Sequence, residues 1–237
     1  MYCTVKKVLD VARAELGYHE KTSAANLDSK TAPNDGMGNY TKYSRDLAAA
    51  GYYNGSKQGF DWCDVFVDWC FYMACGRDRA KAEEVECQTG PYGAGVGFSA
   101  RYYKAQDRFY ASAPKAGDQI FFGDNDHTGL VESIADGYVT TIEGNTSDGT
   151  VQRKKYRLTS TWIMGYGRPK YDKEDEEMRY EKLKDVKEGA YRKTLDKLIA
   201  KGVLAGKGGS GEDLILDLGE DAIRVLVYLD RQGVFGE

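Results

Sequence analysis

An Asp-Gly turn signal between two alternating segments constrains the fold of this chain more than any other feature of its sequence. Residues 127–134 and 138–146 are rich in strand-forming side chains, and Asp136-Gly137 lies between them. This pattern is typical of an antiparallel β-hairpin. The segment 116–122 predicts a further strand just before the hairpin. An antiparallel sheet is therefore expected in the middle of the chain.

The length of the hairpin turn decides which side chains share a face of the sheet. A strict two-residue loop would place His127 on the opposite face from Glu143 and Asn145. A three-residue loop, 135–137, with Gly137 at positive φ, places His127 opposite Asn145 and on the same face as Glu143. We predict the three-residue loop.

A cysteine lies where a turn runs into a helical stretch. Cys63 is followed by apolar residues at offsets of three, four, seven, eight and eleven: Phe66, Val67, Cys70, Phe71 and Ala74. This spacing predicts a helix with one buried face, for which Asp61 can supply the N-cap. A thiol in the first turn of a helix is favoured as thiolate, so Cys63 is a candidate nucleophile. Burial as a small apolar residue is the alternative.

Only two histidines could act as the general base for such a thiol. His127 begins a predicted strand and faces the Glu143 and Asn145 positions, whereas His19 follows the first helix and is interpreted as a capping or surface residue. Either Glu143 or Asn145 could accept a hydrogen bond from one imidazole nitrogen and leave the other for Cys63.

These motifs resemble the CHAP amidase/endopeptidases, a branch of the papain-like thiol hydrolases found in phage endolysins and bacterial wall hydrolases. The resemblance is carried by four segments in the family's order: Trp62-Cys63 with Phe66-Val67, the strand 116–122, His127-Thr128-Gly129-Leu130-Val131, and Glu143-Gly144-Asn145-Thr146. It covers residues 1–168.

The resemblance implies an α+β, papain-like CHAP fold, with N-terminal helices packed on an antiparallel β-sheet. It also implies hydrolysis of peptide or N-acetylmuramoyl-peptide amide bonds in peptidoglycan, as by a phage or prophage endolysin. The catalytic residues would be Cys63, His127, Glu143 and Asn145, acting through a thioester acyl-enzyme. Endopeptidase and amidase activity both stay open.

Length and charge suggest two units and argue against nucleic acid as a partner. The chain has 237 residues, 41% of them apolar, and a formal net charge of −4. Phosphate binding needs a concentrated basic surface, and the short run Arg153-Lys154-Lys155 is interpreted as a solvated face. A charged segment, 169–178, is predicted to be a linker.

Residues 179–237 are predicted to form a small helical domain. Apolar stripes predict helices over 187–201 and from Glu220 to Gly233, the second with Ala222, Val225, Leu226 and Leu229 on its buried face. The segment resembles one surface-layer homology repeat, which implies binding to wall polymers and a possible oligomer through this domain.

The cysteines and the N-terminal segment indicate whether the protein forms disulfides, where it is made and where it acts. Five cysteines without regular spacing predict no structural disulfide, with Cys70, Cys75 and Cys87 in the core. The N-terminal segment predicts an amphipathic helix rather than a signal peptide, and no stretch is apolar enough to span a membrane. We therefore expect synthesis in the host cytoplasm and action on the wall after release.

A polar stretch, 21–41, is predicted to be a long surface loop. No cofactor is expected, although the oxygen ligands of this loop could hold calcium. Several aromatic side chains could line a substrate groove or pack in the core: Tyr40, Tyr43, Tyr52, Tyr53, Trp62, Tyr102 and Tyr103.

Two other readings of the same residues are open. One is a non-lytic wall-binding protein with a degenerate papain-like domain, and the other is a cysteine protease directed at proteins. The intact set of Cys63, His127, Glu143 and Asn145 argues against the degenerate domain, whereas a protease would share this chemistry and differ in its substrate groove.

Overall fold

The computed structural model describes residues 3–88, 95–172 and 179–236. The chain divides into two units, residues 1–172 and 173–237. Most of the predicted linker, its residues 173–178, lies outside the described residues. Tyr171 and Asp172 belong to the first unit: the Tyr171 ring stacks on Phe71, and an Asp172 carboxylate oxygen accepts the Cys3 N–H at 2.7 Å.

One antiparallel sheet forms half of the first unit. Its spatial order is β1-β6-β2-β3-β4-β5, and every neighbouring pair is antiparallel. The strands are β1 (Phe109–Tyr110), β2 (Gln119–Phe122), β3 (His127–Ala135), β4 (Tyr138–Glu143), β5 (Gln152–Arg157) and β6 (Ile163–Gly167). The predicted strand before the hairpin and the hairpin itself are confirmed as β2, β3 and β4.

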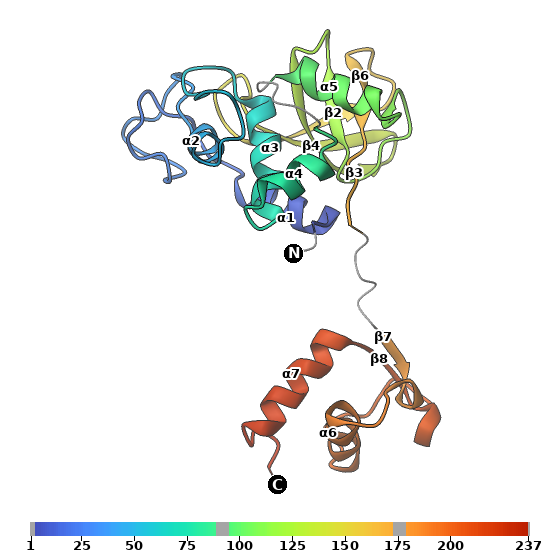
Figure 1. The fold of residues 1–237 in the computed structure, drawn as a ribbon. Coiled ribbons are helices and arrows are strands. Elements are labelled where there is room, and N and C mark those ends of the chain that lie inside the picture. The colour runs from blue at the N-terminus through green and yellow to red at the C-terminus, as the bar shows by residue number, and fades with distance from the viewer. Residues whose placement is uncertain (1–2, 89–94, 173–178, 237) are drawn as a thin grey trace. The chain divides into compact units, whose positions relative to one another are not determined.

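Helices precede the sheet along the chain and pack against it (Figure 1). They are α1 (Val5–Ala14), α2 (Lys42–Ala49), α3 (Cys63–Ala74), α4 (Arg79–Val85) and α5 (Val96–Ala105). The most buried is α3, which contacts α1, α2, α4 and α5 as well as β3 and β4. Helices on a mostly antiparallel sheet confirm the predicted α+β class.

The hairpin has the predicted register near His127, but a bulge in the strand produces it and not a longer turn. Ala135 pairs with Tyr138, so the loop is the two residues Asp136 and Gly137, and the predicted three-residue loop is wrong. Both loop residues have positive φ, 52° and 77°, as a type I′ turn requires. A bulge at Glu132 then shifts the register by one residue.

Beyond that bulge, Leu130 pairs with Ile142. The same register continues toward the site: a Cβ built on Gly129 would lie 2.5 Å from Glu143 Cγ, so these two residues are neighbours across the ladder. His127 and Glu143 therefore lie on one face, as predicted, because the bulge supplies the extra residue that we expected in the turn.

A disulfide joins Cys3, just before α1, to Cys75 at the end of α3, with the Cα atoms 4.8 Å apart. The prediction of no structural disulfide is therefore wrong. Sequence spacing could not reveal the pair, since 72 positions separate the two cysteines and only the packing of α1 against α3 brings them together. Cys63, Cys70 and Cys87 are free and buried.

Aromatic rings fill the core between α2, α3 and the loop after α1. The Tyr43 ring contacts Tyr18, Trp62, Phe66 and Trp69, with centroids 4.8 to 5.5 Å apart. Of the aromatics that could have lined a groove, all but Tyr40 are buried. These six are packing residues, and their rings stabilise the position of α3.

The second unit combines two helices with a two-stranded antiparallel sheet, whereas the sequence predicted only helices. Its elements are β7 (Arg179–Lys182), the 3₁₀ helix η1 (Leu183–Asp185), α6 (Ala190–Ala200), the 3₁₀ helix η2 (Gly211–Asp213), β8 (Ile215–Gly219) and α7 (Glu220–Arg231). Both predicted helices are present. Their small core contains Leu195, Leu216, Ile223 and Val227.

The buried face of α7 differs from the prediction. Ile223 and Val227 are buried, while Val225 is 56% exposed and Tyr228 is 62% exposed. The apolar residues surround most of this helix, so the periodicity did not distinguish the face that packs from the face that stays exposed.

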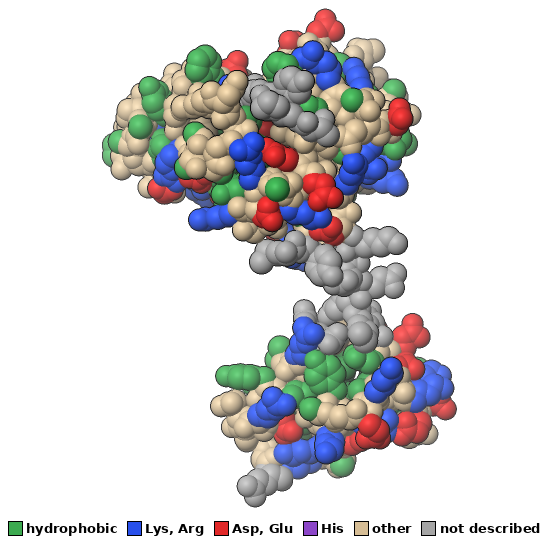
Figure 2. Space-filling view, in the orientation of Figure 1, with side chains coloured by type: hydrophobic (Ala, Val, Ile, Leu, Met, Phe, Trp, Pro, Cys, Tyr) green, Lys and Arg blue, Asp and Glu red, His purple; other side chains and the backbone are tan. Residues whose placement is uncertain are grey.

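Acidic and basic side chains intermix over the face shown in Figure 2. The β5 strand alternates half-buried and exposed residues: Arg153 and Lys155 are exposed, as interpreted, whereas Lys154 is half-buried on the opposite face. Within the described residues, no helix combines the length and apolar character needed to cross a membrane.

Candidate active site

Cys63 is the first residue of α3 and is 5% exposed. It lies in an apolar cluster with Val96, Tyr103 and Phe121. The residue that caps the helix is Trp62, without a side-chain cap bond, so the predicted cap by Asp61 is wrong. The thiol is thus held where the first turn of α3 meets β2 and β3.

The thiol of Cys63 is not pre-ionised. Burial, and after it the charge of Asp64, raise the pKa of Cys63 to about 12, while the backbone N–H groups of Asp64 and Thr128 act in the opposite direction. We expected the helix N-terminus to favour thiolate, but desolvation outweighs it. At neutral pH the thiol is protonated, so any nucleophilic role requires a base that removes its proton.

His127 begins β3, and its Nε2 atom lies 2.9 Å from Oε2 of Glu143. Glu143 is 1% exposed, and its carboxylate also accepts hydrogen bonds from the hydroxyls of Tyr156, at 3.1 Å, and Thr141. Three donors therefore hold this carboxylate. The contact with Nε2 favours the tautomer in which Nδ1 is the free base nitrogen.

Two aromatic rings, stacked on each other with centroids 4.4 Å apart, lie beside the imidazole of His127. Phe122 and Trp162 are both stacked with it, at centroid distances of 5.9 and 6.5 Å. Phe122 pairs with His127 across the β2–β3 ladder, and Trp162 precedes β6. The hydrogen bond to Glu143 and this aromatic pair on one side together restrict the orientation of the ring.

Asn145 follows β4 with a φ of 55° and donates from Nδ2 to Oδ1 of Asp61 at 3.2 Å. Of the two residues expected to orient the imidazole, the structure gives this contact to Glu143. Asn145 instead connects the end of β4 to the turn before Cys63.

Cys63 and His127 come from neighbouring parts of the fold. Thr128 is the residue after His127, and its backbone N–H hydrogen bonds to the Cys63 thiol. Gly144 packs against the first turn of α3, where an added Cβ would lie 2.6 Å from the Trp62 ring. The structure therefore brings the helix of the predicted nucleophile against the strands that carry His127, Glu143 and Asn145.

An open pocket of about 260 Å³ lies beside the imidazole. Its lining consists of His127, Glu143, Asn145, Thr146, Ser147, Lys154, Tyr156 and Trp162. Sequence reasoning missed Tyr156 and Trp162. The alternation along β5 could have placed Tyr156 on the face of Glu143, but no local pattern indicated Trp162, which is 42% exposed.

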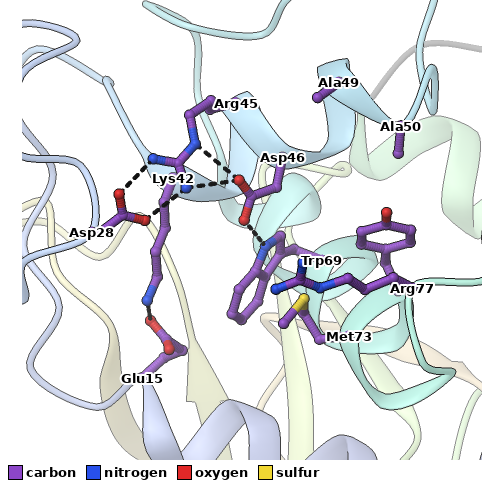
Figure 3. A pocket seen from close by; sticks show the side chains of 11 residues that line it. Glu15, Asp28, Lys42, Arg45, Asp46, Ala49, Ala50, Trp69, Met73 and Arg77 are labelled. Carbon is purple, nitrogen blue, oxygen red and sulfur yellow. Dashed lines mark hydrogen bonds and ion pairs between the residues drawn. The ribbon is translucent and has the colours of Figure 1, made fainter.

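A larger pocket of about 540 Å³ lies between α2 and α3 (Figure 3). Most of its charges pair with one another: Lys42 with Glu15 at 2.7 Å, and Arg45 with Asp28 and Asp46 at 2.7 and 2.8 Å. None of the described residues that line it is a cysteine or histidine. The smaller pocket is the candidate active site because His127, Glu143 and Asn145 line it, although Cys63 is not among its lining residues.

The second histidine has a local role. His19 Nε2 lies 3.0 Å from the carbonyl oxygen of Asp148, and Nδ1 lies 3.9 Å from an Asp35 carboxylate oxygen. His19 does not line the pocket beside His127. His19 is half-buried in the loop after α1 and does not cap that helix, whose C-cap is Glu15, so its interpretation as a capping residue is wrong.

The loop expected to offer calcium ligands uses its carboxylates internally. Asp28 binds the Arg45 guanidinium through both oxygens, and Asp35 binds the ammonium of Lys21 at 2.5 Å. The Lys21 ammonium also donates to the His19 carbonyl at 2.6 Å. Over the described ranges, no group of three or more His, Cys, Asp or Glu side chains could hold a metal ion. Asp28 and Asp35 are therefore already paired with cationic side chains.

One known protein family is similar to part of the first unit. The model of the CHAP domain family matches residues 51–145. This range begins before α3 and ends at Asn145, so it includes Cys63, His127 and Glu143. The first unit is therefore similar to the CHAP domain family over these residues. No curated protein sequence matches the chain.

Three solved structures are similar to the chain at low identity. The crystal structure of Ly7917 is 17% identical over 70% of this chain, with a TM-score of 0.41, and the chain spans only 62% of that protein. The P60 domain of a Mycobacterium avium subspecies paratuberculosis antigen is 13% identical over 69% of this chain and 93% of its own, with a TM-score of 0.34. The peptidoglycan hydrolase RipB of Mycobacterium tuberculosis is 16% identical over 69% of this chain and 63% of its own, with a TM-score of 0.33.

Proposed function

We propose that this protein is a cysteine peptidoglycan hydrolase that cleaves a peptide or N-acetylmuramoyl-peptide amide bond. The observation that carries the proposal is the contact between His127 and buried Glu143, on strands that pack against the helix beginning at Cys63. The CHAP domain match over the same residues supports it.

The raised pKa of Cys63 defines the first step. Because the thiol is protonated at rest, His127 accepts its proton at Nδ1 while sulfur bonds to the scissile carbonyl carbon. The carbonyl electron pair moves onto oxygen. The backbone N–H of Cys63, at the start of α3, can stabilise this oxyanion because helix N-termini leave such groups without an intrahelical acceptor.

Two proton transfers complete the cycle. The C–N bond breaks as the His127 imidazolium gives its proton to the leaving amine, and a thioester on Cys63 remains. Water then attacks the thioester with His127 as base, releasing the carboxylic acid and returning a proton to sulfur. Glu143 stabilises the imidazolium in both halves, since its buried carboxylate lies 2.9 Å from the ring.

We further propose that the protein acts on the wall outside the cytoplasm, as a phage or prophage endolysin does after release. The Cys3–Cys75 disulfide supports action in an oxidising compartment. Fractionation of infected or expressing cells before and after membrane permeabilisation tests this, because the protein should reach the wall only afterwards.

The second unit is proposed to bind wall polymers, alone or as an oligomer. The exposed Val225 and Tyr228 on α7 support a contact surface there. A truncated chain should end at Asp172, because Tyr171 and Asp172 stabilise the first unit. This 1–172 chain should pellet less with purified walls but keep its hydrolytic chemistry, and unchanged pelleting would refute wall targeting.

We propose that no calcium is required. The pairing of Asp28 with Arg45, and of Asp35 with Lys21, supports this. Activity should be the same in a chelator as in added calcium, and loss of activity on chelation that calcium restores would contradict it.

A single assay separates the proposed function from its two rivals. Purified peptidoglycan is incubated with the protein, turbidity is followed, and soluble fragments are identified by mass spectrometry. A hydrolase clears the suspension and the fragments reveal the bond, whereas a degenerate wall-binding protein pellets without clearing it. A protease directed at proteins leaves peptidoglycan intact but cleaves casein.

A further inference from the structure

A buried glutamine connects the helix of the nucleophile to the strand of the base. Gln119 lies on β2 and is 1% exposed. Its side-chain Nε2 donates to Oδ1 of Asp64 at 3.0 Å and to Oγ1 of Thr128 at 3.1 Å. Asp64 follows Cys63, and Thr128 follows His127. One side-chain amide therefore spans the two elements that must meet in the reaction.

The hydrogen bonds of the neighbours fix the orientation of this amide. The Thr128 hydroxyl donates to the Ile120 carbonyl at 2.7 Å, so its oxygen can only accept from Gln119. Asp64 presents a carboxylate oxygen, which also accepts. If the amide were rotated, its carbonyl oxygen would face two acceptors inside the core. Only the observed orientation satisfies all three groups.

Asp64 is itself anchored. Its Oδ2 accepts the Gly95 N–H at 2.8 Å and the Ser99 hydroxyl at 3.0 Å, and the residue is 3% exposed. The groups that hydrogen bond to its side chain are all donors, and these bonds favour the ionised carboxylate against burial, which raises the pKa of Asp64. Thr128 also interacts with Cys63, because its backbone N–H hydrogen bonds to the thiol and lowers the pKa of that thiol. The bridge therefore ends at one fixed point on α3 and one on β3.

We propose that Gln119 is a positioning residue, whose amide holds the Cys63 turn of α3 at a fixed separation from the His127 end of β3 through Asp64 and Thr128. This inference rests on the proposed function, in which Cys63 passes its proton to His127. Displacement of reacting groups by about 1 Å can cost about 100-fold in rate. Loss of the bridge should lower kcat by about 10- to 100-fold and leave KM nearly unchanged, because Gln119 does not line the pocket.

The test removes the hydrogen bonds that Gln119 donates and compares the effect with removal of a similar hydrogen bond to another carboxylate on α3. Gln119→Met keeps the length of the side chain but removes both donors. Gln88→Met is the control, because Gln88 Nε2 donates to buried Asp68 on α3 at 2.8 Å without reaching β3. Thr128→Val removes the hydroxyl, and Thr128→Ser restores it.

Two readouts distinguish positioning from a merely structural role. The first is the rate of peptidoglycan clearing over a range of substrate concentrations. The second is the alkylation rate of Cys63 by iodoacetamide across pH, measured by peptide mass spectrometry, because proton transfer to His127 makes the buried thiol reactive near neutral pH. Gln119→Met and Thr128→Val should lower both at neutral pH, while Gln88→Met and Thr128→Ser should match the wild type.

Wild-type kcat and alkylation in the two bridge variants would overturn the inference. If Gln119→Met fails to fold, the Thr128→Val and Thr128→Ser pair decides. Cys63→Ala, assayed in parallel, separates this inference from the proposed function: clearing by Cys63→Ala refutes the function itself. An inactive Cys63→Ala beside fully active bridge variants refutes only the positioning role.

Discussion

Oε2 of Glu143 lies 2.9 Å from Nε2 of His127, and the two residues occupy diagonal positions on adjacent strands of one sheet. The carboxylate is buried and is held by two further donors, Tyr156 and Thr141. Residues on the strands of the sheet, and not a loop, therefore fix the orientation of the imidazole.

Glu143→Gln should therefore lower the rate of peptidoglycan clearing by about 100-fold, the range expected when a general base loses its orienting charge. Tyr156→Phe is the matched variant, since it removes one donor to the carboxylate but leaves the carboxylate itself, and its loss should be much smaller. Initial clearing rates of the two purified variants measure the difference. Equal rates for Glu143→Gln and the wild type would exclude Glu143 as the orienter.

The register that creates this contact shows how far the sequence could predict the site. Alternation and the Asp136-Gly137 signal predicted the hairpin and the shared face of His127 and Glu143. The bulge at Glu132 could not be predicted, because one extra residue in a strand and one extra residue in a turn give the same register beyond them. The local sequence pattern therefore predicts which residues pair across the two strands, but not whether the extra residue lies in the turn or in a bulge.

Long-range packing explains the other differences. The Cys3–Cys75 disulfide depends on α1 lying against α3, and the raised pKa of Cys63 depends on the burial of the first turn of α3 under β2 and β3. The helix periodicity indicated where Cys63 lies along its helix. It carried no information on how deeply that end of the helix would be covered.

Reduction of the disulfide should lower the stability of the first unit. Cys3 and Cys75 are 72 positions apart, and closing a loop of that length is worth about 4 kcal/mol through the unfolded state. Denaturant unfolding with and without a reductant measures the change. The double variant Cys3→Ser/Cys75→Ser should have the stability of the reduced protein and should not respond to reductant, and a response in that variant would contradict the assignment.

Gly144→Ala should disturb the junction between β4 and α3. A Cβ there would lie 2.6 Å from the Trp62 ring and 2.7 Å from Cβ of Phe66, so the first turn of α3 must shift. We expect a loss of about 1 to 3 kcal/mol in stability, as for other overpacked sites, together with slower clearing. Gly55→Ala is the control, because its Cβ meets no atom within 4 Å. Equal melting temperatures for both variants would refute the close packing.

Glu86→Gln should stabilise the protein increasingly as the pH rises. Asp68 and Glu86 are fully buried and hydrogen bond to each other, and burial raises the pKa of both carboxyls well above their usual values. Their protonated forms favour the folded state, so this contribution is present at acid pH and is lost as the pH rises through the folded pKa values. The glutamine stays neutral.

Melting temperatures of the wild type and Glu86→Gln, measured from about pH 4 to about pH 9, test this linkage. The gap between them should widen toward alkaline pH. Tyr52→Phe serves as the control, because it removes the hydroxyl that donates to Glu86 at 2.7 Å but leaves the carboxyl pair in place. Parallel curves for the wild type and Glu86→Gln would show that the pair does not change its protonation in this range.

The central claim is that Cys63 is the nucleophile, and clearing of purified peptidoglycan by Cys63→Ala tests it most directly. Cys70→Ala is the matched control, since Cys70 is a free, buried cysteine on the same helix. Both variants should show the melting behaviour of folded protein. We expect no clearing by Cys63→Ala and near-normal clearing by Cys70→Ala, and clearing by folded Cys63→Ala at the wild-type rate would show that Cys63 is not the nucleophile.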